Sequence, residues 1–248
     1  LGGNTSFRLS TDGGVSFTTI SSGIPSSGAN RVSVAVTPAD PSYVYVLRSS
    51  SSTSGYAGVY RSTSSGTSFS VMSTSPNILS NPCNASGTDG IGWYALAFAV
   101  SPLDKNEVVA GSVNVWRSLN GGSTWTNYGC WNASGTNPPF VHADHHELEY
   151  TSNGTLYSAN DGGIAERTGS TWTDHTAPRN ISEIYKLGIS NLSANLWITG
   201  HQDNGTSIYN SGNYVYTWGG DGMDCFIDRT NDMNMFCSSQ NGAFRRSN

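Results

Sequence analysis

Ionisable side chains are sparse in this chain and gather in a few short segments. Of its 248 residues only 12 are Lys or Arg and 17 are Asp or Glu. The densest segment is His-Ala-Asp-His-His at residues 142–146, followed by Asn-Asp-Gly-Gly at 160–163 and His-Gln-Asp-Asn-Gly at 201–205. Paired carboxylates can act as acid and base on a glycosidic bond. Carboxylates with imidazoles can also ligate a divalent metal, so we expect any site to lie at these segments.

The elements that must position these side chains follow from an internal repeat. Arg8, Arg61, Arg117 and Arg167 lie 53, 56 and 50 residues apart. Each is followed by a short polar turn and then by Phe or Trp, with the fourth copy shortened. In such a hairpin an Asp or Asn side chain holds its own turn while Gly takes positive φ. A series of this kind indicates a repeat architecture.

Alternating apolar residues predict a pair of strands before each repeated turn. These pairs lie at residues 31–36 and 43–47, 94–100 and 107–110, 146–150 and 155–157, 185–189 and 196–198, and 225–227 and 235–236. Four antiparallel strands in roughly 40 to 60 residues make one β-propeller blade. We therefore expect an all-β propeller of about five blades' worth, with residues 1–248 forming a single domain or a fragment of a longer propeller.

The repeated turn resembles the Asp-box (BNR) repeat, Ser/Thr-x-Asp-x-Gly-x-Ser/Thr-Trp/Phe. Only Asp12 keeps the Asp, with Ser64 and Asn120 at that position in the next copies. Segments 141–146, 154–164, 202–206 and 219–223 resemble secreted Asp-box propellers of Bacteroidota surface proteins, often exported by type IX secretion. The chain is more distantly similar to sortilin (Vps10) and xyloglucanase-type propellers. The resemblance implies an extracellular or cell-surface location.

Composition bears on partners and compartment. The net charge of −5 argues against nucleic acid, and the chain lacks a run of 18 apolar residues that would span a membrane. Abundant Ser, Thr and Asn with four Cys favour secretion. Asn-x-Ser/Thr sequons, which would be glycosylation sites in a eukaryote, include Asn84, Asn132, Asn153 and Asn204.

Four cysteines suggest two disulfides. Cys83 and Cys130 each precede an Asn-Ala-Ser-Gly-Thr segment in loops of adjacent blades, so we expect them to pair. Cys225 and Cys237 flank one hairpin and stand opposite each other, close enough to bridge. The alternative is a set of reduced, buried thiols, as in a cytosolic protein.

Blade topology places the loops after the second and fourth strands on one face, at the entry of the innermost strands. Aligning the innermost strands puts Asn30, Tyr94, Asp144, Glu183 and Asp221 at one position. We expect Asp144, Glu183 and Asp221 at one channel mouth, as candidate catalytic carboxylates. Candidate ligand-binding residues are His142, His145, Asp161, His201, Gln202, Asp203, Asn204, Trp93 and Trp131. Candidate metal ligands are His142, Asp144 and His146, for Ca²⁺ if oxygens dominate.

Structural interpretations compete with each of these roles. The Asp and Asn of the loops can serve only as turn formers, and residues 142–146 can make hydrogen bonds between blades. Successive strand residues face opposite sides, so His145 and His146 do not both point into one site. Glu147, Lys186 and Asp224 share a register position and predict a buried ion-paired triad between blades.

Two classes of function remain open. One is a module that binds a glycan or cleaves it as a glycoside hydrolase, with Trp93 and Trp131 stacking on sugars. A sialidase is disfavoured because its site needs an arginine cluster, whereas most arginines here occupy the repeat position. The other is a non-catalytic surface scaffold or adhesin that binds a protein.

Overall fold

The computed structural model describes residues 6–133, 138–176 and 182–247. It comprises two compact units, residues 1–176 and 177–248, here called the larger and the smaller unit and described separately. Among the described residues every regular element is a β-strand, except a single 3-10 turn at Gln240–Gly242. That part of the chain also holds no helix long and apolar enough to cross a bilayer.

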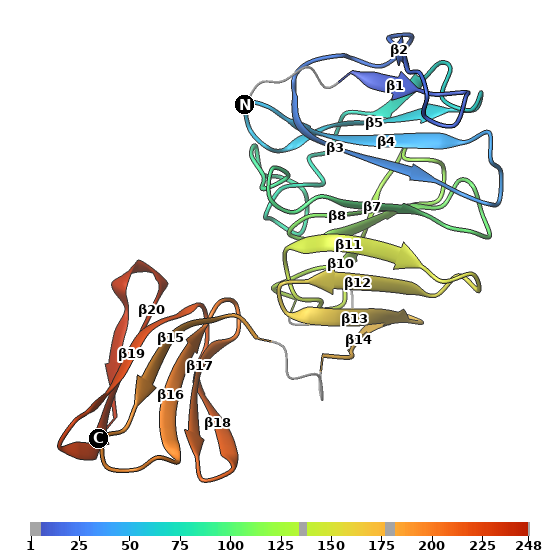
Figure 1. Cartoon of the computed structure of the whole chain (residues 1–248). Helices are drawn as coiled ribbons and strands as arrows, with labels where there is room; N and C mark the ends of the chain where they lie inside the picture. The colour runs from blue at the N-terminus through green and yellow to red at the C-terminus, as the bar shows by residue number, and fades with distance from the viewer. Residues whose placement is uncertain (1–5, 134–137, 177–181, 248) are drawn as a thin grey trace. The chain divides into compact units, whose positions relative to one another are not determined.

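The larger unit contains one two-stranded and three four-stranded antiparallel sheets, each a simple meander in chain order (Figure 1). Its strands are β1 (Phe7–Leu9), β2 (Thr18–Ile20), β3 (Ala29–Val36), β4 (Val44–Ser50), β5 (Tyr56–Ser62), β6 (Ser70–Ser73), β7 (Ala97–Val100), β8 (Val108–Gly111), β9 (Val115–Ser118), β10 (Thr126–Gly129), β11 (His145–Tyr150), β12 (Leu156–Asn160), β13 (Gly163–Thr168) and β14 (Thr171–Asp174). We call β3–β6, β7–β10 and β11–β14 the first, second and third blades.

The smaller unit contains one four-stranded and one three-stranded antiparallel sheet. Its strands are β15 (Ile184–Ile189), β16 (Leu196–His201), β17 (Gly205–Asn210), β18 (Asn213–Trp218), β19 (Gly222–Asp228), β20 (Asn231–Ser239) and β21 (Phe244–Arg246). We call β15–β18 the fourth blade. These sheets confirm the predicted all-β fold of β-propeller blades, about five blades' worth in all.

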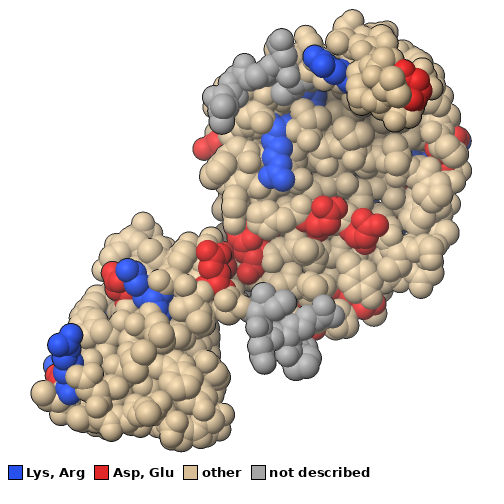
Figure 2. All heavy atoms as spheres, viewed as in Figure 1, with Lys and Arg blue, Asp and Glu red and all other residues tan. Residues whose placement is uncertain are grey.

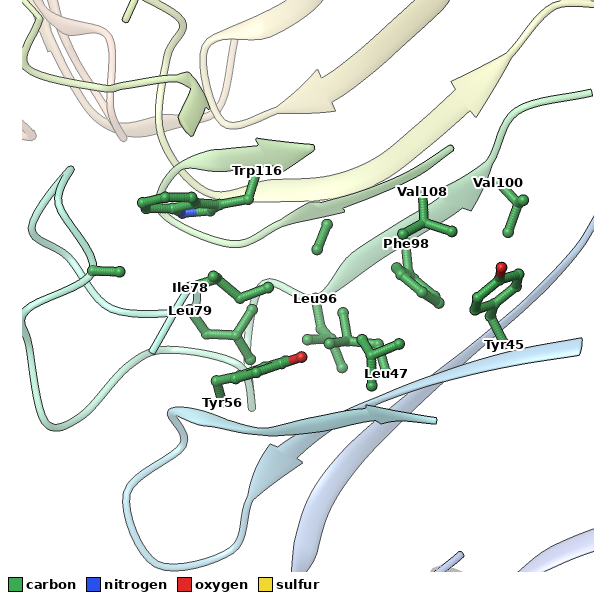
Figure 3. Close-up of a cluster of buried hydrophobic side chains, with 13 residues drawn as sticks. Tyr45, Leu47, Tyr56, Ile78, Leu79, Leu96, Phe98, Val100, Val108 and Trp116 are labelled. Carbon is green, nitrogen blue, oxygen red and sulfur yellow. The ribbon is translucent and has the colours of Figure 1, made fainter. Parts of the chain in front are cut away.

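The blades of the larger unit stack face to face in chain order, with β3 beside β7 and β7 beside β11 (Figure 1). Strands covered on both faces read as continuous apolar runs, and β7 and β8 are buried at every residue. Figure 3 shows Tyr45 and Leu47 from β4 gathered with Phe98 and Val100 from β7, in one cluster between the first and second blades. The blades are therefore held together mainly by apolar burial.

The loop between β6 and β7 is part of this core. Ile78 and Leu79 are fully buried in it, and Cys83 forms a disulfide with Cys130, which follows β10. The predicted Cys83–Cys130 pair is thus confirmed, and it ties the loops that leave the first two blades.

The prediction of a second disulfide was wrong. Cys225 and Cys237 face each other in the register of β19 and β20, as expected, but both thiols are free. The Cys225 thiol is directed into the core instead, with Sγ 3.3 Å from the carbonyl oxygen of Ile198. Burial raises the pKa of Cys225 and keeps its thiol protonated.

The repeated turns share one hydrogen-bond pattern. The Asp12 carboxylate accepts hydrogen bonds from the amide of Ser16 at 2.9 Å and from its hydroxyl at 2.5 Å. Asn120 accepts from the amide of Thr124 at 2.9 Å in the same way. These bonds, chiefly that from the Ser16 hydroxyl, lower the pKa of Asp12 to about 2. The side chain at this position therefore holds its own turn, as the sequence predicted.

Candidate functional site

A hydrogen-bonded polar group of the larger unit lies where the innermost strands of the second and third blades begin. Tyr94 precedes β7, His146 is in β11, and Asp161 is in the turn between β12 and β13. Tyr94 donates a hydrogen bond to Asp161 Oδ2 at 2.9 Å, and His146 Nε2 lies 2.6 Å from Asp161 Oδ1. The Tyr94 and His146 rings meet edge to face, with centroids 4.8 Å apart. We call these three residues the rim triad.

The rim triad is partly exposed to solvent, and its Tyr94 is held by a hydrogen bond to its backbone. The Asp161 side chain is 12% exposed, whereas that of His146 is 38% exposed. Arg31 of the first blade donates a hydrogen bond to the Tyr94 carbonyl, so three successive blades contribute. Trp93 is 63% exposed, and its ring centroid lies 5.6 Å from that of Tyr94. An exposed indole therefore contacts the tyrosine that donates to the anchored carboxylate and meets the accessible imidazole.

A β-bulge aims His146 at this group. In the pairing of β11 with β12, His145 opposes Asn160 and Glu147 opposes Ala159, which leaves His146 as the extra residue. Bulges re-aim side chains and interrupt pairing at strand ends. The same bulge recurs at Asn30 in β3 and at Tyr185 in β15. Each bulged residue makes a side-chain hydrogen bond to the turn that follows the second strand of its own blade. The pairs are Asn30 with Ser54, His146 with Asp161, and Tyr185 with Gln202.

This register corrects part of the sequence alignment. The bulges make Asn30, His146 and Tyr185 equivalent, whereas the alignment matched Asn30 with Asp144. The reason is length: β3 has eight residues and β11 has six, so counting back from their far ends overshoots in the third blade. The register position of Tyr94 can be read from the sequence, but its hydrogen bond to Asp161 cannot, because Asp161 belongs to another blade.

His145 does not belong to the rim, so its prediction as a ligand-binding residue was wrong. It is fully buried, and its Nδ1 lies 2.6 Å from the hydroxyl of Ser158 inside the third blade. Its Nε2 is buried without a hydrogen-bond partner. Burial is the main cause that lowers the pKa of His145 to about 3, so the ring is neutral at pH 7. His145 and His146 thus face opposite sides, as strand alternation predicted.

His142 and Asp144 stand at the entry of β11. Both are partly buried, and Asp144 has a positive φ of 64°. His142 packs against Gly162, where an added Cβ would come within 2.4 Å of the imidazole Cγ. Asn160 accepts a hydrogen bond from the Gly162 amide at 3.0 Å and is a turn former. In Asn-Asp-Gly-Gly, then, Asn160 and Gly162 shape the turn, and Asp161 is left to face the rim.

In the smaller unit the predicted residues organise the entries of β15 and β19. The Asp221 carboxylate accepts a hydrogen bond from the Asp203 amide at 2.9 Å. The Glu183 carbonyl accepts one from the Gln202 amide at 3.1 Å, while the Glu183 side chain is exposed. Asn204 is exposed as well. These contacts show Asp221 ordering a turn.

His201 is structural. Its Nδ1 lies 2.6 Å from the Ser182 hydroxyl and its Nε2 lies 2.7 Å from the Thr199 hydroxyl. The residue is buried, and burial lowers the pKa of the imidazole. Both ring nitrogens are occupied, so the prediction of His201 as a ligand-binding residue was wrong.

Asp144, Glu183 and Asp221 each lie directly before an innermost strand, β11, β15 and β19. Asp144 belongs to the larger unit and the other two to the smaller. Their common channel mouth therefore stays a prediction. The metal set of His142, Asp144 and His146 stays a prediction too; His146 Nε2 is occupied by Asp161, which leaves Nδ1 as its ligand atom.

Trp131 and Lys186, for which the sequence also predicted roles, both make defined contacts. Trp131 is partly exposed, and its indole donates to the Asn81 carbonyl at 3.3 Å, which joins two loops. Lys186 and Asp224 pair within the smaller unit, at 3.6 Å, and their side chains are 60% and 78% exposed. Exposed pairs of this kind contribute little to stability. Glu147 belongs to the larger unit, so the buried triad stays a prediction.

The innermost strands of the larger unit border a cavity of about 540 Å³. Its wall is apolar on the first two blades, with Val34, Val36 and Val100, and acidic on the third, with Glu147 and Glu149. Figure 2 shows acidic side chains gathered over the third blade on the viewed face, while most of the remaining surface is uncharged. On this face the acidic side chains thus lie over the third blade, the blade that carries Glu147 and Glu149.

No family model and no curated protein sequence matches the chain. Solved structures resemble it. A GH74 enzyme of Niastella koreensis is 20% identical over 86% of this chain and 34% of that one, with a TM-score of 0.38. A GH74 xyloglucanase of Xanthomonas campestris is 15% identical over 89% of this chain and 37% of that one, with a TM-score of 0.43. PorZ, a surface component of the type IX secretion system of Porphyromonas gingivalis, is 11% identical over 98% of this chain and 31% of that one, with a TM-score of 0.49. The chain spans about a third of the length of each.

Proposed function

We propose that the chain binds glycans at the rim triad and Trp93. The observation that carries this proposal is the exposed indole packed on Tyr94, whose hydroxyl donates to the anchored Asp161 carboxylate. A sugar ring can stack on the indole face, and a carboxylate accepts strong hydrogen bonds from hydroxyl groups. Trp93 contacts the Tyr94 ring and Asp161 accepts a hydrogen bond from Tyr94, so these side chains are positioned as one set.

Hydrolysis at the rim is the further possibility that this proposal includes. Glycosidases use two carboxylates, and their separation decides between inversion and retention. Asp144 is the candidate partner of Asp161, since it lies in the same unit at the entry of the strand that carries His146. Glu183 and Asp221 are the corresponding candidates of the smaller unit.

We also propose that the repeated turns are Asp boxes and that the protein works outside the cell, as a surface protein of the type IX-secreted kind. The hydrogen bonds around Asp12 support the first point. The Cys83–Cys130 disulfide supports the second, because disulfides persist chiefly in oxidising compartments. The sequon asparagines Asn84, Asn132, Asn153 and Asn204 are all exposed.

A glycan array with the full chain, followed by calorimetry on the best binder, tests the rim. Trp93→Ala and Asp161→Asn are each expected to weaken binding by about tenfold or more, because each removes an interaction of at least about 1.4 kcal/mol. Phe140→Ala is the matched control, since Phe140 is an exposed aromatic residue of the same unit outside the triad.

A reducing-sugar assay on the bound glycan then separates binding from cleavage. If product forms, Asp144→Asn is expected to abolish it and leave binding within a few fold. Equal affinity of wild type, Trp93→Ala and Asp161→Asn for every glycan would sink the proposal. A chain that binds no glycan but captures a surface protein through this rim would instead be a scaffold or adhesin.

A further inference from the structure

A second site lies at the opposite end of the blades from the rim. A groove of about 730 Å³ runs between the outer strands of the second and third blades, β9–β10 and β13–β14. Strand β13 separates it from Asp161, since Asp161 precedes β13 while Arg167 and Ser170 lie at its far end. Six strand residues span about 20 Å. A ligand of the groove therefore does not touch the rim triad.

The groove is basic in an acidic protein. Two arginines, Arg117 and Arg167, line it, and among the described residues no Asp or Glu does. Arg117 forms an ion pair with Glu107, which does not line the groove, with 2.8 Å between Arg117 Nε and Glu107 Oε1. Arg167 makes no ion pair with any described residue. The positive charge of Arg167 is thus not compensated locally.

The Arg167 guanidinium is held in place by rings and lacks hydrogen bonds. It lies 4.1 Å from the Tyr128 ring centroid and 5.8 Å from that of Trp172. Its Nε and Nη1 are buried without hydrogen-bond partners. Ring contact offsets part of the desolvation of a cation, but unsatisfied charged donors remain costly. Because Nε and Nη1 are closed off from solvent, a ligand in the groove can reach only the remaining nitrogen, Nη2, for which an oxyanion is the strongest acceptor.

The rest of the wall suits a polyhydroxylated ligand. The hydroxyls of Thr126 and Ser170 line the groove, are exposed, and make no hydrogen bond to a described residue. Asn120 and Asn127 also line the groove, but their amides already bond to Thr124 and to the Cys83 carbonyl. Leu119 supplies an apolar ledge that is largely exposed. The volume is within the range of small-ligand pockets.

We propose that this groove binds an acidic saccharide. Its carboxylate or sulfate lies against Arg167, with Arg117 adding to the positive potential, and its hydroxyls face Thr126 and Ser170. This site is separate from the proposed glycan site at the rim, and the proposal for the groove does not depend on the proposal for the rim.

Calorimetry with the full chain tests the groove, with tri-galacturonate as the probe. Arms with a sulfated galactose trisaccharide, neutral galactotriose and an acidic hexapeptide define the chemistry. We expect the uronate or the sulfated sugar to bind, more weakly as salt rises, and at least tenfold tighter than galactotriose. Binding of the hexapeptide alone, or equal binding of the neutral sugar, would overturn the proposal.

Variants locate the site. Arg167→Gln is expected to lose at least tenfold in affinity, and Arg167→Lys to lose less, since it keeps the charge but not the fork. Arg61→Gln is the matched control: Arg61 occupies the repeat position of the first blade, over the Tyr43 ring, and does not line the groove. Unchanged affinity in both Arg167 variants would overturn the proposal.

The two proposed sites fail separately. Loss of tri-galacturonate binding in Asp161→Asn, with Arg167→Gln unaffected, would locate the acidic sugar at the rim and refute the groove. If Arg167→Gln proves unstable by thermal melting, two other variants carry the test. Arg167→Lys keeps a long cationic side chain, and Arg117→Gln leaves the contact between Arg167 and Tyr128 intact.

Discussion

The larger and smaller units use the same antiparallel meander but bury it to different degrees. In the second blade, β7 and β8 are buried throughout, whereas β18 in the fourth blade is exposed at every residue but its last. The cluster between the first and second blades contains thirteen buried residues, and that of the smaller unit contains four. Within its own unit, a blade of the larger unit thus buries strands that the fourth blade leaves exposed.

The exposed residues of the smaller unit make the same point. Ile184, Leu187 and Ile189 on β15 are each more than half exposed, as are Tyr214 and Tyr216 on β18. These are strand-forming residue types that ordinarily pack against something. The difference teaches that hydrogen-bonded strands of similar residue types can differ widely in the apolar area that they bury.

The largest expected effect that sharpens this comparison is a core truncation. Leu79→Ala should destabilise the protein by about 2–5 kcal/mol, because Leu79 is fully buried between blades. The matched change in the smaller unit, Leu187→Ala, removes a side chain that is 53% exposed and should cost about 0.5 kcal/mol or less. Chemical denaturation measures both. Equal losses would show that the two units do not differ in packing.

Removing the cross-link comes next. Cys83→Ser with Cys130→Ser opens a loop of 47 residues, and disulfides of this kind typically contribute about 2–4 kcal/mol. Cys225→Ser with Cys237→Ser breaks no bond in the smaller unit and should cost less. Thermal melting of the two double variants, with and without reductant, checks the contrast. A larger loss in the second pair would mean that those thiols are joined.

Acidification is expected to have the smallest effect. Burial lowers the pKa of His145 to about 3, so between that value and the ordinary 6.5 the unfolded chain binds the extra proton. Stability from His145 is therefore complete above pH 6.5 and is lost as the pH falls, by about 1.4 kcal/mol at pH 5.5. His201 acts in the same direction in the smaller unit. His145→Gln should flatten the pH dependence of denaturation; an unchanged slope would rule out His145 as its source.

Much of the fold was predictable because it is periodic. The repeated Arg–turn–aromatic segments and the alternating strands before them identified the blades, and Asp12 and Asn120 hold their turns as their residue types predict. The Cys83–Cys130 pair followed from two similar loops in adjacent blades. The turns are local, so sequence neighbours determine them, whereas the disulfide could be predicted because the blades repeat.

The candidate sites were less predictable because they depend on neighbouring blades and on bulges. Alternation shows that His145 and His146 face opposite sides, but only the bulge decides which one reaches the rim. Tyr94 meets Asp161 across 67 residues of sequence. Arg167 matches a repeated position, and only the packing around Tyr128 reveals that its guanidinium lacks partners.

The recurrent bulge has a consequence for how such a surface can evolve. A bulged residue takes no part in the ladder of paired residues, so exchanging it alters what the blade presents without shifting the strand. Three blades already carry three different side chains there, an amide at Asn30, an imidazole at His146 and a phenol at Tyr185. Recognition can therefore diverge one blade at a time, while the hydrogen-bonded framework beneath it stays under a separate selection.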